Sequence, residues 1–297
     1  MIYEIYHETT FDYAALVTFS HNIARLKPKD FATQKLLEYS LKIEPTPYEM
    51  SEFVDYFENT NNFMLIREAH TSLKVVATSK VHRVEEEINK QIKNLKNVSI
   101  TVGEAKQRLN KYYKDDVLAK LFLFETESIP MPSNEIKAYA LESFQENRNL
   151  FEATNEFMGR IFNDFSFVSG FTDITTPIET VFKEKKGVCQ DFAQFAISAL
   201  RSIGIPTRYV SGYIQTIPAE GKEKLFGADA SHAWFSVYIP TFGWACFDPT
   251  NNKIPNEEYI ILGYGRDYLD IAPLKGVVQS SGGSNLKVKV NVEAIKE

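Results

Sequence analysis

Cys189 stands at a position where a thiol could act as a nucleophile. It is one of two cysteines in the 297-residue chain, and it follows Gly187 and opens the stretch "CQDFAQFAISALRSIG", which has a helical pattern. The thiolate is the reactive form of cysteine, and the unpaired N–H groups at a helix N-terminus favour that negative charge. The same N–H groups could hold the oxyanion that forms when a thiolate attacks a carbonyl carbon. The sequence therefore favours nucleophilic chemistry at Cys189.

A nucleophilic cysteine also needs a base, and His232 is the best-placed histidine. It opens the strand pattern "HAWFSVYI", 43 residues after Cys189, and Asp248 ends the strand pattern "WACFD" 16 residues further on. A carboxylate beside the imidazole could fix its tautomer and stabilise its charged form. We therefore predict a triad of Cys189, His232 and Asp248. The other histidines lie in the N-terminal region, where we expect them to be structural or exposed: His7, His21, His70 and His82.

The loop between these two strands decides whether His232 and Asp248 share a face of the sheet. Side chains alternate between the faces of a strand, so a four-residue loop over 240–243 would turn Asp248 away from His232. A five-residue loop over 238–242 would place Asp248 directly opposite His232, about 5 Å away. The triad therefore predicts the five-residue loop, or a bulge with the same effect on the alternation.

Less specific interpretations of these residues stay open. A buried structural residue is the commonest role of a lone cysteine. We expect Cys246 to be a small strand residue, and a disulfide between the two cysteines is conceivable but disfavoured in a reducing compartment. A zinc site built from both cysteines, His232 and Asp248 would lack the paired ligand spacing of such sites, so we expect no metal.

Four neighbours of the predicted triad are candidates for supporting roles. Asp191 could stabilise the start of the helix, or it could be a first-turn acid on the surface. Gln190 could line the cleft or be solvated. Trp234 and Trp244 are expected to pack beside the site more than to bind substrate.

The elements that must position these residues fall into four segments. Residues 1–85 show short alternating runs such as "MIYEIYH" and "SLKVVATSKV" between turn signals, which predicts an N-terminal β-sandwich. Residues 86–150 predict a helical connecting segment, since "NEIKAYALESF" is amphipathic at helical spacing. Residues 151–275 hold the cysteine helix and the two strands of the triad. Residues 276–297 include the alternating run "NLKVKVNVEAI", which predicts a C-terminal strand that could return to the N-terminal sheet.

The composition is that of an ordinary soluble globular protein, with 44% hydrophobic and 24% charged residues. The net charge of −6 argues against a surface for nucleic acid or an anionic membrane. The start "MIYEIYHETT" lacks the basic and apolar regions of a signal peptide, and no run of about 18 apolar residues is present. Two cysteines cannot form a disulfide scaffold. We therefore expect a cytoplasmic protein without a membrane span.

Two longer stretches carry the predicted triad in order, "KGVCQDFAQFAISALRSIGIPTRYVSGY" and "HAWFSVYIPTFGWACFDPTNN". In motifs and spacing they resemble the transglutaminase-like superfamily, and more closely its bacterial branch, whose members are often described provisionally as cysteine proteases. "HETTFDY", "RLKPKD" and the region of Gln34 resemble the N-terminal β-domain of that branch, and "YGRDYLDIAPLKGVV" resembles its C-terminal segment. The resemblance covers nearly the whole chain, although residues 101–133 follow the family only loosely.

The resemblance implies an α+β fold, with an N-terminal antiparallel β-sandwich followed by a papain-like or transglutaminase-like core. In that core the cysteine helix packs on an antiparallel sheet, with Cys189 as nucleophile, His232 as general base and acid, and Asp248 orienting the imidazole.

The implied chemistry attacks an amide of a protein or peptide substrate and forms a thioester. We favour a cysteine protease or amidase. Transglutaminase-type acyl transfer to an amine stays open, as does a non-catalytic module for protein binding or scaffolding. No cofactor is expected, and no acidic loop has the ligand spacing of a calcium site.

Overall fold

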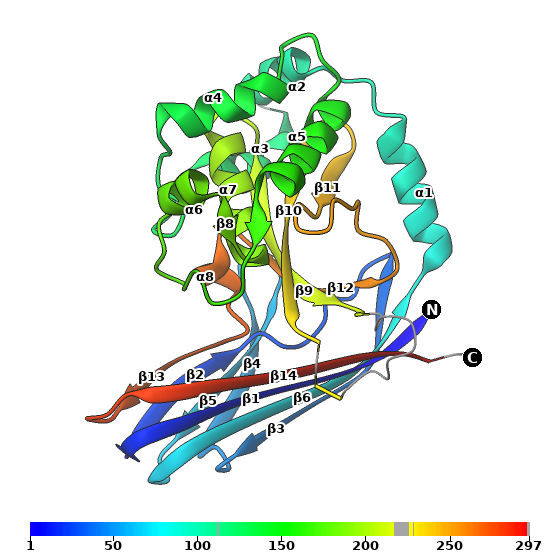
Figure 1. Cartoon of the computed structure of the whole chain (residues 1–297). Coiled ribbons are helices and arrows are strands. Elements are labelled where there is room, and N and C mark those ends of the chain that lie inside the picture. The colour runs from blue at the N-terminus through cyan, green and yellow to red at the C-terminus, as the bar shows by residue number, and fades with distance from the viewer. Residues whose placement is uncertain (112, 217–225, 228, 296–297) are drawn as a thin grey trace, which may run out of the picture.

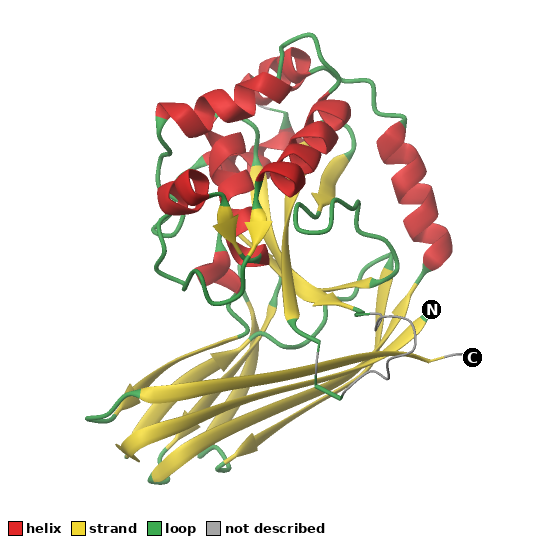
Figure 2. Cartoon of the chain, viewed as in Figure 1, coloured by secondary structure: helices red, strands yellow, loops and turns green. Residues whose placement is uncertain are grey.

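The chain folds into two lobes, a β-sandwich and a lobe of helices around a sheet (Figure 1) (Figure 2). The computed structural model describes residues 1–297 apart from 112, 217–225, 228 and 296–297. The first strands of the chain and the last strands lie side by side in the sandwich, while the helices gather at the other end of the molecule. The predicted α+β class is confirmed.

The sandwich consists of two four-stranded antiparallel sheets. The first has the order β14 (Ser284–Ile295), β1 (Ile2–Val17), β6 (His70–Arg83) and β3 (Gln34–Glu44). The second has the order β13 (Leu274–Gln279), β2 (Phe19–Ala24), β5 (Thr60–Ile66) and β4 (Glu49–Val54). Apolar side chains of both sheets fill the space between them, among them Leu73, Val75, Met64 and Ile66. The alternation in "SLKVVATSKV" thus marks the inward face of β6.

Residues that follow the second lobe in sequence complete both sheets of the sandwich. β14 pairs with β1 along most of its length, from Ile2 opposite Ile295 to Tyr13 opposite Ser284. β13 pairs with β2 in the other sheet. We predicted one strand over 276–297; the structure has two, because the chain turns back at 280–283 and the strand before this turn joins the second sheet.

The second lobe is built around a four-stranded antiparallel sheet with the order β11 (Gly243–Phe247), β10 (Ser231–Ile239), β9 (Thr207–Ile214) and β12 (Tyr259–Gly265). Helices α5 (Leu150–Asp164) and α7 (Cys189–Ser202) pack against β10. Ala233, Phe235 and Val237 of β10 are buried under these helices. One face of the sheet is therefore apolar, and the alternate face is free to carry polar residues.

The second lobe also contains further helices and a pair of very short strands. They are α1 (Glu85–Lys96), α2 (Val102–Asn110), α3 (Lys114–Val117), the 3₁₀ helix η1 (Leu118–Leu123), α4 (Asn134–Ser143), β7 (Ser166–Phe167), α6 (Ile178–Glu184), β8 (Lys186–Gly187) and α8 (Tyr268–Ile271). Within the described residues, no helix is both long and apolar enough to cross a membrane.

The segment predicted as a helical connection packs into the core of the second lobe. Val102, Ile136 and Phe144 are buried in the same apolar cluster as Phe195 of α7. Thr101 caps α2 by accepting the N–H of Glu104, whose side chain accepts the N–H of Thr101 in return, so the two residues form a capping box.

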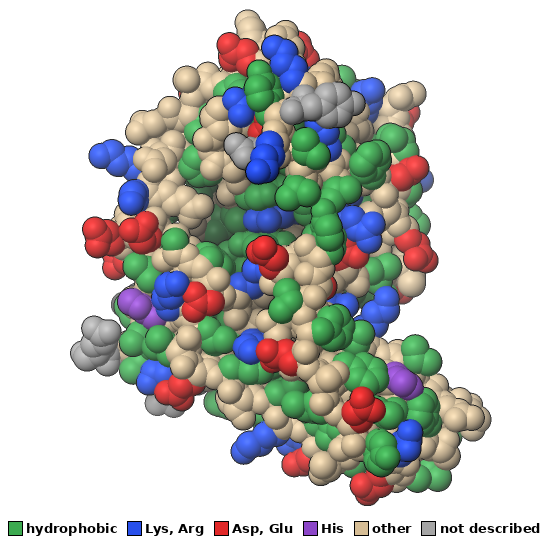
Figure 3. All heavy atoms as spheres, turned by 180° about the vertical axis from the view of Figure 1, so that it is seen from behind, with side chains coloured by type: hydrophobic (Ala, Val, Ile, Leu, Met, Phe, Trp, Pro, Cys, Tyr) green, Lys and Arg blue, Asp and Glu red, His purple; other side chains and the backbone are tan. Residues whose placement is uncertain are grey.

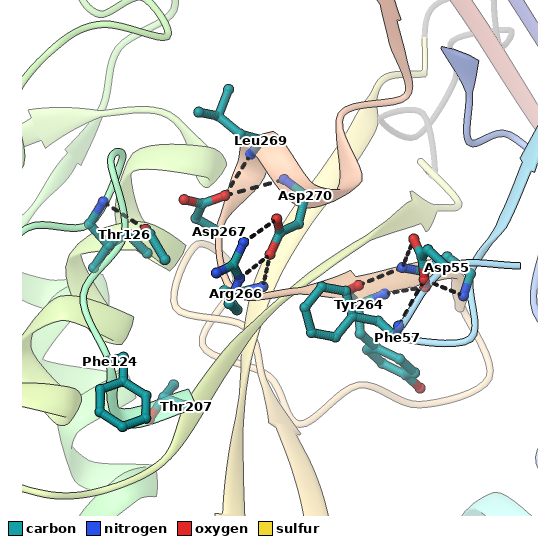
Figure 4. A network of polar contacts seen from close by, with 12 residues as sticks. Asp55, Phe57, Phe124, Thr126, Thr207, Tyr264, Arg266, Asp267, Leu269 and Asp270 are labelled. Atoms are coloured by element: carbon teal, nitrogen blue, oxygen red, sulfur yellow. Dashed lines mark hydrogen bonds and ion pairs between the residues drawn. The ribbon is translucent and has the colours of Figure 1, made fainter. Parts of the chain in front are cut away.

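Two side-chain amides from the sandwich lobe hold the outer edge of β12. Gln34 donates to the carbonyl of Ile261 and accepts the N–H of the same residue, both at 2.8 Å. Asn59 donates to the carbonyl of Tyr264 at 2.7 Å and accepts its N–H at 2.9 Å. Asp55 lies beside Tyr264 (Figure 4) and accepts hydrogen bonds from the backbone and side chain of Asn59. Each amide therefore satisfies edge groups that a neighbouring strand would otherwise bind.

His7 of β1 forms another junction between the lobes. Its Nδ1 lies 2.8 Å from the hydroxyl of Tyr213 on β9, and its Nε2 lies 3.0 Å from the hydroxyl of Thr9. The side chain is buried, and this burial lowers the pKa of His7 to about 4. The ring is therefore neutral near pH 7 and serves as a hydrogen-bonding link.

Replacing His7 by Gln should remove one source of acid instability. The pKa of His7 in the folded protein, about 4, lies below its ordinary value of 6.5, so unfolding takes up a proton between these values. The neutral ring therefore stabilises the fold fully above about pH 6.5, and this contribution falls as the pH drops, by about 3 kcal/mol at pH 4. Urea unfolding between pH 7 and pH 4 should show a smaller loss of stability in His7→Gln than in the wild type. An equal loss in both would contradict this account, and His21→Gln, at an exposed position, serves as the control.

Candidate active site

Cys189 is the first residue of α7, and the backbone before it is anchored by Asp191. The N–H of Val188 donates to the Asp191 carboxylate at 2.7 Å, and the hydroxyl of Thr172 donates to the same oxygen at 2.6 Å. Burial raises the pKa of Asp191, while these two hydrogen bonds oppose the shift. Gly187 makes room for this carboxylate, because a Cβ there would lie 2.8 Å from the Asp191 side chain. The glycine two residues before Cys189 is thus explained by packing.

The loop between β10 and β11 has three residues, 240–242, so the predicted five-residue loop is wrong. Its middle residue and Gly243 adopt positive φ values of 78° and 100°, which lets the chain reverse in fewer residues. Phe247 pairs with Phe235, so this register places Asp248 across from Trp234 and not directly opposite His232. The two residues still share a face of the sheet, because positions 232 and 234 alternate together.

The imidazole of His232 is held between the carboxylate of Asp248 and the thiol of Cys189. Its Nε2 lies 2.7 Å from Oδ2 of Asp248, which leaves Nδ1 available to the Cys189 side chain that interacts with the same ring. His232 is 8% exposed and Asp248 is 0% exposed. Burial alone would lower the pKa of His232, but hydrogen bonds and charges from Asp248 and Cys189 outweigh it and raise the pKa to about 10. The ring can therefore carry a proton at neutral pH while it contacts the thiol.

The buried carboxylate of Asp248 has donors besides His232. The hydroxyl of Tyr259 and the side-chain amide of Asn251 each donate to Oδ2 at 2.7 Å, and the N–H of Thr250 donates to Oδ1 at 2.9 Å. Burial acts to raise the pKa of Asp248, but the hydrogen bonds and the charge of His232 lower it below its ordinary value. Asp248 is therefore held as a carboxylate in the protein interior.

Sequence reasoning missed Tyr259 and Asn251. Asn251 lies three residues after Asp248 in "DPTNN". An amide that close in sequence could have been predicted to donate a hydrogen bond to the carboxylate. Tyr259 comes from β12, whose place beside β9 depends on long-range pairing. Nothing local in the sequence indicates which side chain of β12 meets Asp248.

A cavity of about 160 Å³ borders Cys189 and His232. Its walls come from both lobes, including Phe11, Leu286 and Val288 of the sandwich and Tyr209, Ser211 and Tyr268 of the second lobe. Leu286 and Val288 are about half exposed, at 54% and 46%. The sandwich thus supplies an apolar rim to the cavity that holds the thiol.

The predicted supporting residues lie in different surroundings. Gln190 lines the cavity at Cys189. Trp234 is completely buried, with its ring centroid 5.8 Å from that of His232. Trp244 lines a separate, larger cavity together with Cys246.

Both cysteines are unpaired. The described part of the chain contains no group of three or more His, Cys, Asp or Glu side chains that could hold a metal ion.

Two family models match the chain. The bacterial transglutaminase-like N-terminal region matches residues 3–82, which cover the strands of the sandwich from β1 to β6. The transglutaminase-like superfamily matches residues 137–249, which include Cys189, His232 and Asp248.

Proteins similar over almost the full chain occur in mycobacteria. An uncharacterised protein of Mycobacterium tuberculosis is 32% identical over 299 residues, covering 99% of this chain and 92% of the relative. An uncharacterised protein of Mycobacterium leprae is 29% identical over 292 residues, covering 97% of each. A crystal structure from Cytophaga hutchinsonii, described provisionally as a cysteine protease, matches with a TM-score of 0.74 at 20% identity and covers 100% of this chain and 92% of that one, which supports the fold. The chain therefore belongs to the transglutaminase-like superfamily, in its bacterial branch with an N-terminal β-domain.

Proposed function

We propose that the chain is a thiol-dependent enzyme that hydrolyses amide bonds of peptides or proteins. The observation that carries this proposal is one imidazole that is hydrogen-bonded to a buried carboxylate and that also interacts with a thiol at the start of a helix. Such an arrangement polarises a thiol toward the thiolate and keeps a proton ready for a leaving group.

The first half-reaction uses the three side chains in sequence. The Cys189 thiolate attacks the amide carbonyl carbon, and the N–H of Cys189 with a second donor stabilises the oxyanion. His232 gives its proton to the leaving amine, which departs as the C–N bond breaks and leaves a thioester on Cys189. Asp248 holds the ring through Nε2 and stabilises its charged form.

In the second half-reaction, water attacks the thioester and His232 takes its proton. The acid is released, and the Cys189 thiolate and the protonated ring are restored. The cavity at Cys189, about 160 Å³, favours this course. Small-molecule sites usually measure ~300–1,000 Å³, so this one suits a short part of an extended substrate and leaves little room for a second organic reactant.

The thiol chemistry can be tested by limited alkylation. Iodoacetamide in limiting amount should modify Cys189 selectively well below pH 8, because the imidazolium of His232 stabilises the thiolate. This selectivity should disappear in His232→Ala. Cys246 in the same molecule is the internal control, and peptide mass spectrometry would locate the adducts.

A different result would point to a non-catalytic role. Slow and equal labelling of both cysteines, unchanged in His232→Ala, would favour a scaffolding or protein-binding module. Circular dichroism of the variant would show that lost selectivity does not come from unfolding.

Hydrolysis and acyl transfer can be separated in one reaction. Denatured casein and dansylcadaverine would be incubated with the protein, and new N-termini or ammonia would be compared with dansyl incorporation. We expect release to exceed incorporation, and both to vanish in Cys189→Ala. Each transfer to the amine also releases one ammonia. Ammonia equal to the dansyl group incorporated, without new N-termini, would therefore overturn hydrolysis in favour of transglutaminase-type transfer.

Tyr259→Phe should shift the acid limb of the pH–rate profile to higher pH. The hydroxyl of Tyr259 is one of the donors that lower the pKa of Asp248, so its removal raises that pKa and protonates the carboxylate at higher pH. Loss of a hydrogen bond to a charged group should also cost about 1.5–3 kcal/mol of stability.

The pH dependence of Cys189 alkylation measures the shift from Tyr259→Phe, and thermal unfolding measures the stability. Tyr39→Phe is the matched control, because the hydroxyl of Tyr39 makes a hydrogen bond to Asn62 inside the sandwich lobe. An unshifted acid limb in Tyr259→Phe would remove Tyr259 from the group that positions Asp248.

A further inference from the structure

A cavity of about 890 Å³ lies away from the thiol, against the face of the sheet that α5 and α7 leave uncovered. It is bordered by α1, by the segment 29–33 and by Arg208 of β9, Trp244 of β11 and Tyr264 of β12. Seen from behind (Figure 3), the second lobe is hollowed, with hydrophobic atoms and Lys or Arg atoms in the hollow. The volume falls within the ~300–1,000 Å³ of typical small-molecule sites.

Arg208 presents a positive charge in this cavity without a neutralising partner. Its guanidinium carbon lies 3.5 Å from the ring centroid of Tyr264 and 4.3 Å from that of Trp244. Contact with an aromatic ring leaves the N–H groups of a guanidinium available for hydrogen bonds. Nε is buried, and no hydrogen bond or ion pair joins any of its nitrogens to another described residue. Planar donors held in this way suit a carboxylate or phosphate.

Arg83 adds a second incompletely satisfied guanidinium to the same cavity. It is only 3% exposed. Nη1 donates to Gln34 and Nη2 donates to the carbonyl of Asn256, while the buried Nε has no partner in the described part of the chain. Burial lowers the pKa of Arg83 to about 10, and the charge of Glu257 only partly opposes this shift.

The charges of both guanidinium groups reach the same side chain, that of Tyr264. The charges of Arg208 and Arg83 both lower the pKa of Tyr264, which burial nevertheless raises to about 12. Lys29, also at the cavity, donates to the backbone carbonyls of residues 57 and 58, and the nearby charges of Glu58 and Asp55 partly compensate it.

The acidic side chains that line the cavity are Asp30, Glu58 and Glu87, and none of them forms an ion pair with Arg208 or Arg83 in the described part of the chain. The charge of Glu58 acts on Lys29. Asp30 pairs with Lys35, and Glu87 pairs with Lys90. Buried cations are normally compensated by an anion, and buried unpaired N–H groups call for an explanation. Arg208 and Arg83 therefore lack an anion that pairs with them in the described part of the chain.

We propose that this cavity binds a small organic anion, whose carboxylate or phosphate pairs with Arg208 and Arg83 while its apolar part packs on Trp244 and the neighbouring walls. The site is separate from the thiol, but Tyr259 lines it and donates its hydroxyl to Asp248. This proposal does not depend on the proposed hydrolysis.

The test uses the full chain with Cys189→Ala, so that catalysis plays no part and Cys246 is the sole thiol. Benzoate and phenyl phosphate would be titrated by calorimetry and by tryptophan fluorescence. Inorganic phosphate and acetate control for the charge alone, and benzyl alcohol controls for the ring alone. We expect saturable binding of an aromatic anion, tighter than that of any control. Stronger binding of benzoate or of phenyl phosphate would identify the anionic group.

Arg208→Gln should weaken this binding at least about tenfold, since it removes a hydrogen-bond donor to a charged group. Arg67→Gln is the matched control, because Arg67 also stacks on a tyrosine, at 4.0 Å from the ring centroid of Tyr48, but is exposed and outside the cavity. The affinity of Arg67→Gln for the aromatic anions should equal that of the Cys189→Ala parent.

A second readout needs no arginine variant, in case Arg208→Gln fails to fold. Cys246 lines the cavity, so the bound anion should protect it from N-ethylmaleimide. Absence of saturable binding by both aromatic anions would overturn the proposal. Equal affinity in folded Arg208→Gln, or binding without protection of Cys246, would do the same. None of these outcomes bears on alkylation of Cys189 in the wild type, so the two proposals fail separately.

Discussion

A carboxylate without access to solvent, that of Asp248, is the constraint on which the geometry of the site depends. A buried charge is costly unless hydrogen bonds compensate for it. Here the compensation comes from His232 on β10, Tyr259 on β12 and two groups in the turn after β11. These elements must keep one relative position for the carboxylate to stay charged. The same requirement fixes the imidazole that reaches toward Cys189. The hydrogen bonds that stabilise the buried carboxylate therefore also position His232.

β12 connects this constraint to the sandwich. Tyr259, at its start, faces Asp248, while Ile261 and Tyr264 are held by the amides of Gln34 and Asn59. An unpaired strand edge would otherwise be open to pairing with other chains. The sandwich therefore protects the edge of the sheet, and through β14 it also contributes the apolar rim of the cavity at the thiol. The N-terminal lobe is thus a structural part of the site.

Local patterns and the family resemblance predicted most of what lies near Cys189, His232 and Asp248. The helix start, the strand of His232 and the shared face of the hairpin all follow from short-range periodicity. The loop length was wrong because a turn at positive φ shortens it by two residues, and that change of two preserves the alternation. Tyr259 and the amide contacts to β12 depend on pairing between residues far apart in sequence, which periodicity does not specify. The uncompensated cations around Arg208 likewise emerge only when β9, β11 and β12 lie side by side.

The order of the strands along the chain has a consequence for biosynthesis. β1 needs β14 on its outer side and β2 needs β13, yet both partners are translated after the whole second lobe. Until residues 274–295 have emerged from the ribosome, β1 and β2 are therefore edge strands of three-stranded sheets and lack their final partners. Such edges invite self-association during synthesis. Late pairing of the early strands, after residues 274–295 are available, would avoid that exposure.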